Sequence, residues 1–148
     1  MIAARLEILS SKVPEILILN RKLSGKSPLI DGAAVLARAK LAVAIKDVAD
    51  EAIAYLQERA SANKKLKLSA NENAHSFDHR RQIVIDLNDS SGEHHIGKVA
   101  DLEISLHGFK LYDAKGVFHG KKEWGDFPAA IKVLGEQIEQ LDEVKRLC

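Results

Sequence analysis

The periodicity of the apolar residues changes once along this chain, and that change sets the expected fold class. Up to about residue 62, apolar side chains recur at the spacing of amphipathic helices. Beyond about residue 75, apolar and polar residues alternate, as they do on strands with one buried face. Helices followed by consecutive alternating strands predict an α+β domain with an antiparallel sheet.

The longest expected helix covers residues 31–63. Its sequence, DGAAVLARAKLAVAIKDVADEAIAYLQERASAN, is rich in Ala, Leu, Lys and Glu and contains no proline. The expected core face consists of Leu41, Ile45, Val48, Ala52, Tyr55 and Leu56. Because so much of this helix is alanine, a neighbouring helix can approach it closely, within the chain or from a second copy.

The residues on either side of this helix are less regular. Ile2, Leu6, Leu9 and Val13 predict a short N-terminal helix that ends before Pro14. Residues 15–23 fit either a second short helix or a strand, and 24–28 are expected to form a loop. The polar stretch 63–74 is predicted to be a linker.

The second half of the chain predicts a meander and a closing helix. Segments 82–88 and 98–107 alternate, and DAKG at 113–116 is expected to turn a hairpin. Asp126 is expected to cap a helix with Pro128 in its first turn. The apolar face of this helix is expected to contain Ala130, Ile131, Leu134, Ile138, Leu141 and Val144. Gly135 lies near that face, where another backbone is expected to approach.

Together these elements predict one α+β domain over residues 1–148. It contains N-terminal helices including one long Ala-rich helix, then a three- or four-stranded antiparallel meander and a C-terminal amphipathic helix. The helical part is expected over 1–62, the linker over 63–74, and the sheet with its helix over 75–148.

Composition narrows the range of partners and compartments. Twenty-two Lys and Arg against 21 Asp and Glu give a net charge of +1, so the whole molecule attracts neither nucleic acid nor anionic membranes strongly. The one cysteine, Cys148, excludes an internal disulfide framework and a multi-cysteine zinc site. Apolar runs are short, and charged residues interrupt the first twenty positions. These features predict a soluble cytoplasmic protein with no membrane partner.

Three short motifs resemble parts of metal or nucleotide sites. His75 and His79 would lie about 13 Å apart on a strand, too far to share one metal, and meet only on a helical turn. The adjacent His94 and His95 point to opposite faces if the chain is extended. Gly25-Lys26-Ser27 lacks the first glycine of a phosphate-binding loop, because Asn20 stands there. We therefore expect no metal and no cofactor.

Strand phasing predicts a polar outer face on the sheet. Leu102, Ile104 and Leu106 point to the core, so the residues between them point outward. A four-residue hairpin loop would pair Tyr112 with Val117 and Lys110 with His119, leaving Leu111 and Phe118 on the core face. The predicted binding residues are Asp101, Glu103, His107, Lys110, Tyr112 and His119, with Ser105 beside them.

This face predicts a small protein-interaction domain, regulatory or inhibitor-like, that binds an unidentified protein and is not an enzyme. Self-association through the Ala-rich helix would give a homodimer. One alternative is a small enzyme with a His/carboxylate site on or beside the sheet. The other is a nucleic-acid accessory protein that uses three local basic clusters, with Trp124 near the last of them to stack on bases. Those clusters are Lys64-Lys65-Lys67, Arg80-Arg81 and Lys121-Lys122.

Overall fold

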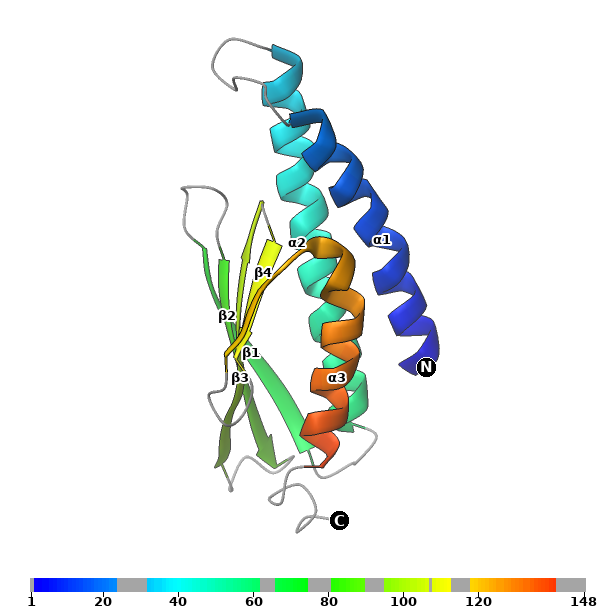
Figure 1. Ribbon diagram of the computed structural model, residues 1–148. Coiled ribbons are helices and arrows are strands. Elements are labelled where there is room, and N and C mark those ends of the chain that lie inside the picture. The colour runs from blue at the N-terminus through cyan, green and yellow to red at the C-terminus, as the bar shows by residue number, and fades with distance from the viewer. Residues whose placement is uncertain are drawn as a thin grey trace.

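The predicted α+β architecture is confirmed. The computed structural model describes residues 2–23, 32–61, 66–74, 81–89, 95–106, 108–112 and 118–140. Over these ranges two N-terminal helices precede an antiparallel meander and a C-terminal helix. The helices lie on one face of the sheet, and the two N-terminal helices form a hairpin that extends past the end of the sheet (Figure 1). Within the same ranges, no helix combines the length and apolar character needed to cross a membrane.

The first helix, α1 (Ile2–Leu23), continues through Pro14, so the predicted end at that residue is wrong. A proline inside a helix removes one backbone hydrogen bond and costs about 3 kcal/mol. Leu9, Val13, Ile16 and Leu19 are nevertheless all buried on one side of this helix. Burying each such side chain contributes about 1.5–3 kcal/mol, which together exceeds the cost of the proline. Residues 15–23, ambiguous in the sequence, are therefore helical.

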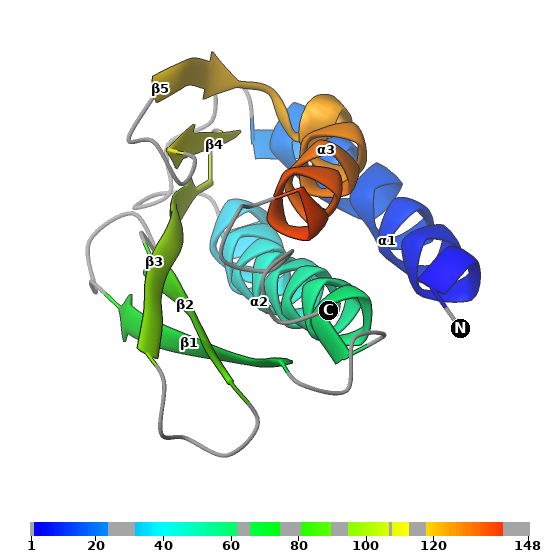
Figure 2. The same ribbon diagram turned by 90° about the horizontal axis from the view of Figure 1, so that it is seen from below.

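The second helix, α2 (Gly32–Ser61), matches the longest predicted helix, and all six residues of its expected core face are buried. It lies between the sheet and α1, and the C-terminal helix lies beside both (Figure 2). Ala44, Ala49 and Ala60 are buried as well. The close approach that alanine allows is therefore used within this chain.

The sheet has five strands in the order β1-β2-β3-β4-β5, so each strand pairs with its neighbour in sequence. The meander begins one strand earlier than expected, because Leu66–Ala74, predicted as linker, forms β1. This strand pairs antiparallel with β2 (Arg81–Asp89) along its whole length. Leu68 is its buried anchor, and with so few apolar residues the strand has a weak sequence signal.

The third strand, β3 (His95–Ser105), is irregular at its start. Its register against β2 shifts between Ile85 and Asp86 and again between Leu87 and Asn88. Gly97, opposite Leu87, adopts a φ of 114°, a conformation that favours glycine. Because of the first bulge, Val99 and Ala100 are both buried, whereas strict alternation would expose Val99.

The last hairpin joins β4 (Gly108–Tyr112) to β5 (Phe118–Lys122), and its predicted register is wrong. Tyr112 pairs with Phe118 and Lys110 with Lys121. Between these two pairs β4 has one residue, and β5 has two, His119 and Gly120. The extra residue is a bulge, which a sequence pattern of strict alternation does not reveal. Phe118 therefore stands opposite Tyr112 and not beside Leu111, and residues 113–117 lie outside the described ranges.

An aromatic cluster attaches the closing helix to the sheet. A short 3-10 turn, η2 (Trp124–Asp126), leads directly into α3 (Phe127–Glu139). Trp124 and Phe127 pack edge to face with ring centroids 5.1 Å apart, and Phe127 packs likewise on Phe109 of β4 at 5.0 Å. The Trp124 indole N–H donates a hydrogen bond to the Ser105 carbonyl oxygen at 3.1 Å. This bond satisfies the one polar atom of a buried indole.

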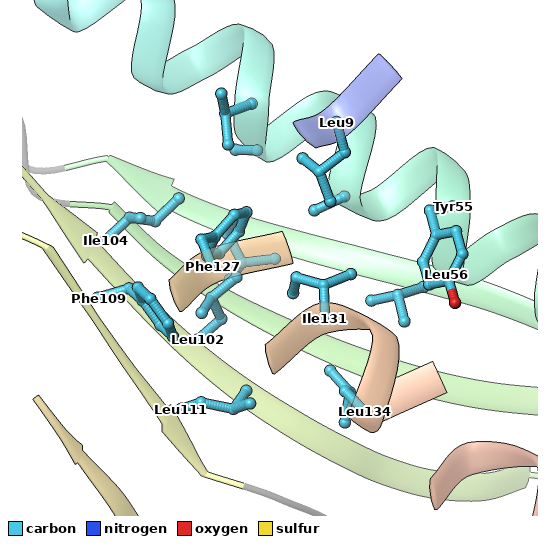
Figure 3. Packing of buried hydrophobic residues seen from close by; sticks show 14 of the residues in the cluster. Leu9, Tyr55, Leu56, Leu102, Ile104, Phe109, Leu111, Phe127, Ile131 and Leu134 are labelled. Carbon is cyan, nitrogen blue, oxygen red and sulfur yellow. The ribbon is translucent and has the colours of Figure 1, made fainter. Parts of the chain in front are cut away.

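The inner face of α3 is as predicted at Ile131, Leu134 and Ile138, which are all buried. Ile131 and Leu134 point into the core between the sheet and α2 (Figure 3). Leu141 and Val144 lie outside the described residues. Asp126 occupies the N-cap position, as expected, but its side chain makes no capping hydrogen bond.

Gly135 accommodates a side chain of α2, and not the backbone that the sequence led us to expect. A Cβ atom at this position would lie 2.6 Å from Cδ of Arg59. The Arg59 guanidinium donates from Nε and Nη2 to the two carboxylate oxygens of Glu139, at 2.9 and 2.8 Å. It also donates from Nη1 to the Tyr55 hydroxyl at 2.8 Å. The absence of a side chain on glycine therefore leaves room for a bidentate ion pair between α2 and α3.

We expect Gly135→Ala to lower the free energy of unfolding by about 1–2 kcal/mol, because displacing Arg59 outweighs the roughly 1 kcal/mol helix-propensity gain. In an Arg59→Ala background, the same substitution is expected to be about 1–2 kcal/mol less destabilising, because no arginine has to move and only Cε1 of Tyr55, 3.3 Å from the new Cβ, opposes the propensity gain. Urea denaturation of the four proteins in this double-mutant cycle measures both effects. An equal effect in both backgrounds would contradict the role assigned to Gly135.

Candidate functional site

The outer face of the sheet, on the side away from the helices, brings four of the six predicted site residues together. Asp101 stands opposite Tyr112, and Glu103 stands opposite Lys110, on the paired strands β3 and β4. The buried residues between them, including Leu102 and Leu111, point to the helix layer. Alternation along two adjacent strands therefore builds this face from carboxylate, ammonium and phenol groups.

A small polar network centres on Asp101. The Gln82 Nε2 amide of β2 donates to both of its carboxylate oxygens at 3.2 Å. The Lys98 ammonium lies 3.9 Å from Oδ2 on the other side. The Asp101 side chain is only 18% exposed, because its neighbours cover it. Its negative charge is held in place by an amide and a lysine, which fixes the pattern of charge on the surface.

The middle row of the outer face also carries apolar area. Val84 of β2 and Tyr112 of β4 flank Asp101 in register, and Asn71 of β1 continues the row. Val84 and Tyr112 are both partly exposed. An aromatic ring with a polar hydroxyl beside fixed charges is a composition that protein interfaces favour.

The histidines and the glycine-lysine-serine segment singled out in the sequence lie outside the described part of the structure, wholly or in their side chains. His107 lies outside the described residues, and so do His75, His79 and His94. His119 belongs to the bulge in β5, and the placement of its side chain lies outside the description, as does that of His95 in β3. Gly25-Lys26-Ser27 also falls in a range that is not described. Within the described ranges, no group of three or more His, Cys, Asp or Glu residues is arranged to hold a metal ion.

Two residues weaken the nucleic-acid alternative. Trp124, expected to stack on bases, is 1% exposed and is engaged by Phe109, Phe127 and the Ser105 carbonyl. Arg81 forms an ion pair with Glu72 of the neighbouring strand. A buried indole offers no stacking surface, and a paired arginine loses part of its attraction for phosphate.

A pocket lies on the opposite side of the sheet, between β4 and α3. Its volume is ≈ 320 Å³, and its lining from β4 is Phe109 and Leu111. None of the four predicted site residues whose side chains the structure describes lines it. Sequence reasoning missed this site because it considered only the inner apolar stripe of the closing helix. The signal that identifies it is the set Asp126, Ala130, Val133 and Gln137, which lie on one side of the helix beside the core stripe.

Two other clusters of charge connect helices. Arg5 of α1 donates from Nε to the Glu58 carboxylate of α2 at 3.1 Å, and its Nη1 lies 3.6 Å from Oε2 of Glu51. The hydrogen bond from Arg5 is the main reason that the pKa of Glu58 is lowered from its ordinary value. At the other interface, the hydrogen bond to Glu139 raises the pKa of Arg59. Both pairs are structural, because each spans two helices and neither lines the pocket.

The lowered pKa of Glu58 predicts a pH-dependent contribution to stability. A carboxyl group whose pKa falls on folding stabilises the folded state above its unfolded value, here 4.5, and loses that contribution as pH falls through the folded value. We therefore expect Glu58→Gln to lower the melting temperature at pH 7, and the difference from wild type to shrink below pH 4.5. Glu136→Gln, at an exposed position on α3, is the control for charge removal. A wild-type difference that stays constant from neutral to acid pH would contradict the assignment.

Comparison of the chain with protein-family models, with curated proteins and with solved structures gave no match. A functional assignment therefore rests on the residues described above.

Proposed function

We propose that this chain is a protein-binding domain, and that its partner contacts the outer face of the sheet. The observation that carries the proposal is the register that aligns Asp101 with Tyr112 and Glu103 with Lys110 on a face that the helices leave uncovered (Figure 2). Such a surface combines an aromatic group with charges of both signs.

The residues of this face have separable roles in the proposed contact. Tyr112 and the neighbouring Val84 supply apolar area that a partner would remove from water. The exposed Lys110 and the fixed carboxylate of Asp101 supply opposite charges that would orient the partner. Aromatic residues dominate the energy of most interfaces, whereas peripheral charges act more on association rate and specificity. Tyr112 is therefore the expected energetic centre.

Affinity capture from the native cell extract tests the proposal with three variants of the bait. A partner retained by the wild type is expected to bind at least about tenfold more weakly to Tyr112→Ala, because truncating an aromatic anchor costs 2 kcal/mol or more. Lys110→Glu is expected to slow association. Lys132→Glu makes the same charge change at an exposed position on α3 and is expected to retain the partner.

Thermal unfolding of each bait establishes that the variants are folded. A partner that binds the two outer-face variants as tightly as the wild type, and is lost with Lys132→Glu, would overturn the assignment of the face. A bait that captures nothing in a saturable manner would overturn the function itself.

Self-association is a second proposal, and it is supported by apolar side chains on the outside of the helical hairpin. Among the side chains that the structure describes in α1 and α2, the large exposed apolar ones are Ile8, Leu17, Ile18, Val35, Leu36 and Val43. Leu36 and Val43 are 58% and 62% exposed. They lie seven residues apart, so they share one side of α2, away from the buried Ala49 and Ala52. A homodimer through this side would cover them both.

Sedimentation velocity is expected to give a dimer for the wild type and a monomer for Leu36→Lys/Val43→Lys, because two buried lysines at an interface lack partners. Val133→Lys, at a 50% exposed valine of α3, is the matched control and is expected to remain dimeric. A monomeric wild type at high micromolar concentration would contradict this second proposal.

A further inference from the structure

The pocket between β4 and α3 has the size and lining of a small-molecule site. Its volume of ≈ 320 Å³ corresponds to about ten water molecules of liquid volume, at the lower end of the range for ligand pockets. Phe109 and Leu111 form the wall on the sheet side and extend from β4 toward α3 (Figure 3). A ligand that displaces water from this apolar wall binds favourably, because apolar surface is removed from water.

The opposite wall is a regular stripe along α3. Asp126, Ala130, Val133 and Gln137 line the pocket at intervals of four, three and four residues. This spacing places them on one side of the helix and spreads them over about 16 Å at 1.5 Å per residue. Ala129 and Leu134 border the same stripe. Over the described lining, the site is therefore an elongated groove whose two ends are polar and whose middle is apolar.

Small side chains account for the open space. Ala129 and Ala130 occupy the turn of α3 next to Asp126, where larger residues would reach across to β4. Val133, one turn further, is 50% exposed although it lies beside the buried Leu134. An apolar ligand in the groove would cover Val133 and make van der Waals contacts in the space that the small alanine side chains leave open.

The charge at one end selects the ligand. Asp126 stands at the N-cap of α3, yet its carboxylate makes no capping hydrogen bond. No ion pair or hydrogen bond joins this carboxylate to another side chain of the described residues. A carboxylate at the rim of an apolar groove attracts a cationic group and repels an anion, and the positive N-terminal end of the α3 dipole offsets part of this preference. At the far end Gln137 is neutral and offers a hydrogen-bond donor and acceptor.

We propose that this groove binds a primary amine with a linear or arylalkyl apolar body, its ammonium group at Asp126 and its chain along Ala130 and Val133 toward Gln137. The apolar stripe supplies affinity, and the carboxylate supplies the preference for a cation. This site is independent of the outer face, because the two lie on opposite sides of the sheet.

Titration with n-alkylamines tests the proposal. In protein carrying carbon-13-labelled alanine methyl groups, octylamine is expected to shift the Ala129 and Ala130 signals, which serve as reporters inside the groove. Each added methylene between hexylamine and octylamine is expected to tighten binding about fourfold, because each one is removed from water. Octanoate, which has the same chain length and the opposite charge, is expected to bind more weakly.

Three variants assign the contacts. Asp126→Asn is expected to weaken octylamine binding about fivefold at low salt, the size of an exposed ion pair. Glu136→Gln removes the same charge from an exposed position of α3 that does not line the groove, and it is expected to leave the affinity unchanged. Ala129→Leu fills the groove from an exposed helical position, so binding is expected to be lost while the melting temperature stays within a few degrees.

Several results would overturn the proposal. Unshifted Ala129 and Ala130 methyl signals at millimolar octylamine would mean that the groove takes no such ligand. Equal binding of octanoate and octylamine, or equal effects of Asp126→Asn and Glu136→Gln, would remove the assigned role of Asp126. Methyl shifts that depend on protein concentration without added amine would assign the groove to a second copy of the chain.

Discussion

The buried side of α2 is the surface against which the rest of the molecule is assembled. Leu41 and Ile45 lie in its first half, and Val48, Ala52 and Leu56 continue the buried side toward the C-terminal end. The sheet, α1 and α3 all contact this helix, as the view along it shows (Figure 2). Because alanine keeps the helix narrow over much of this side, three different elements can pack around one cylinder. The functional surfaces are the parts that this arrangement leaves uncovered, namely the far face of the sheet and the flank of α3.

The most regular parts of the sequence were the most predictable. A helical period held over thirty residues identified α2 and its buried face, and strict alternation identified which of Leu102, Glu103 and Ile104 point inward. Both patterns are local, so the buried face of a strand or helix can be predicted from the sequence of that element alone. The four residues of the outer face that the structure describes follow from that phasing. Their use in binding remains a proposal, because no pattern within one chain specifies a partner.

The features that prediction missed depend on contacts between distant segments. Pro14 lies within α1 because buried residues before and after it pack on α2. Sequence rules for helix ends do not include the energy of such packing. The strand β1 forms beside β2 although its own sequence is mostly polar. The bulge at His119 and Gly120 changes which residues face each other across the last hairpin. The groove along α3 was missed for a related reason, since it exists only where Ala129 and Ala130 approach β4.

The order of the strands has a consequence for how this chain folds. Every pair of neighbouring strands is consecutive in sequence, and α1 and α2 form a hairpin of their own. Both units can therefore develop from contacts that close short loops, at low entropic cost. The closing helix is different, because Arg59 and Glu139 are 80 positions apart and Trp124 must reach the end of β3. The docking of α3 against α1 and α2 closes long loops, so a large loss of chain freedom falls on the step that also builds the α3 wall of the groove.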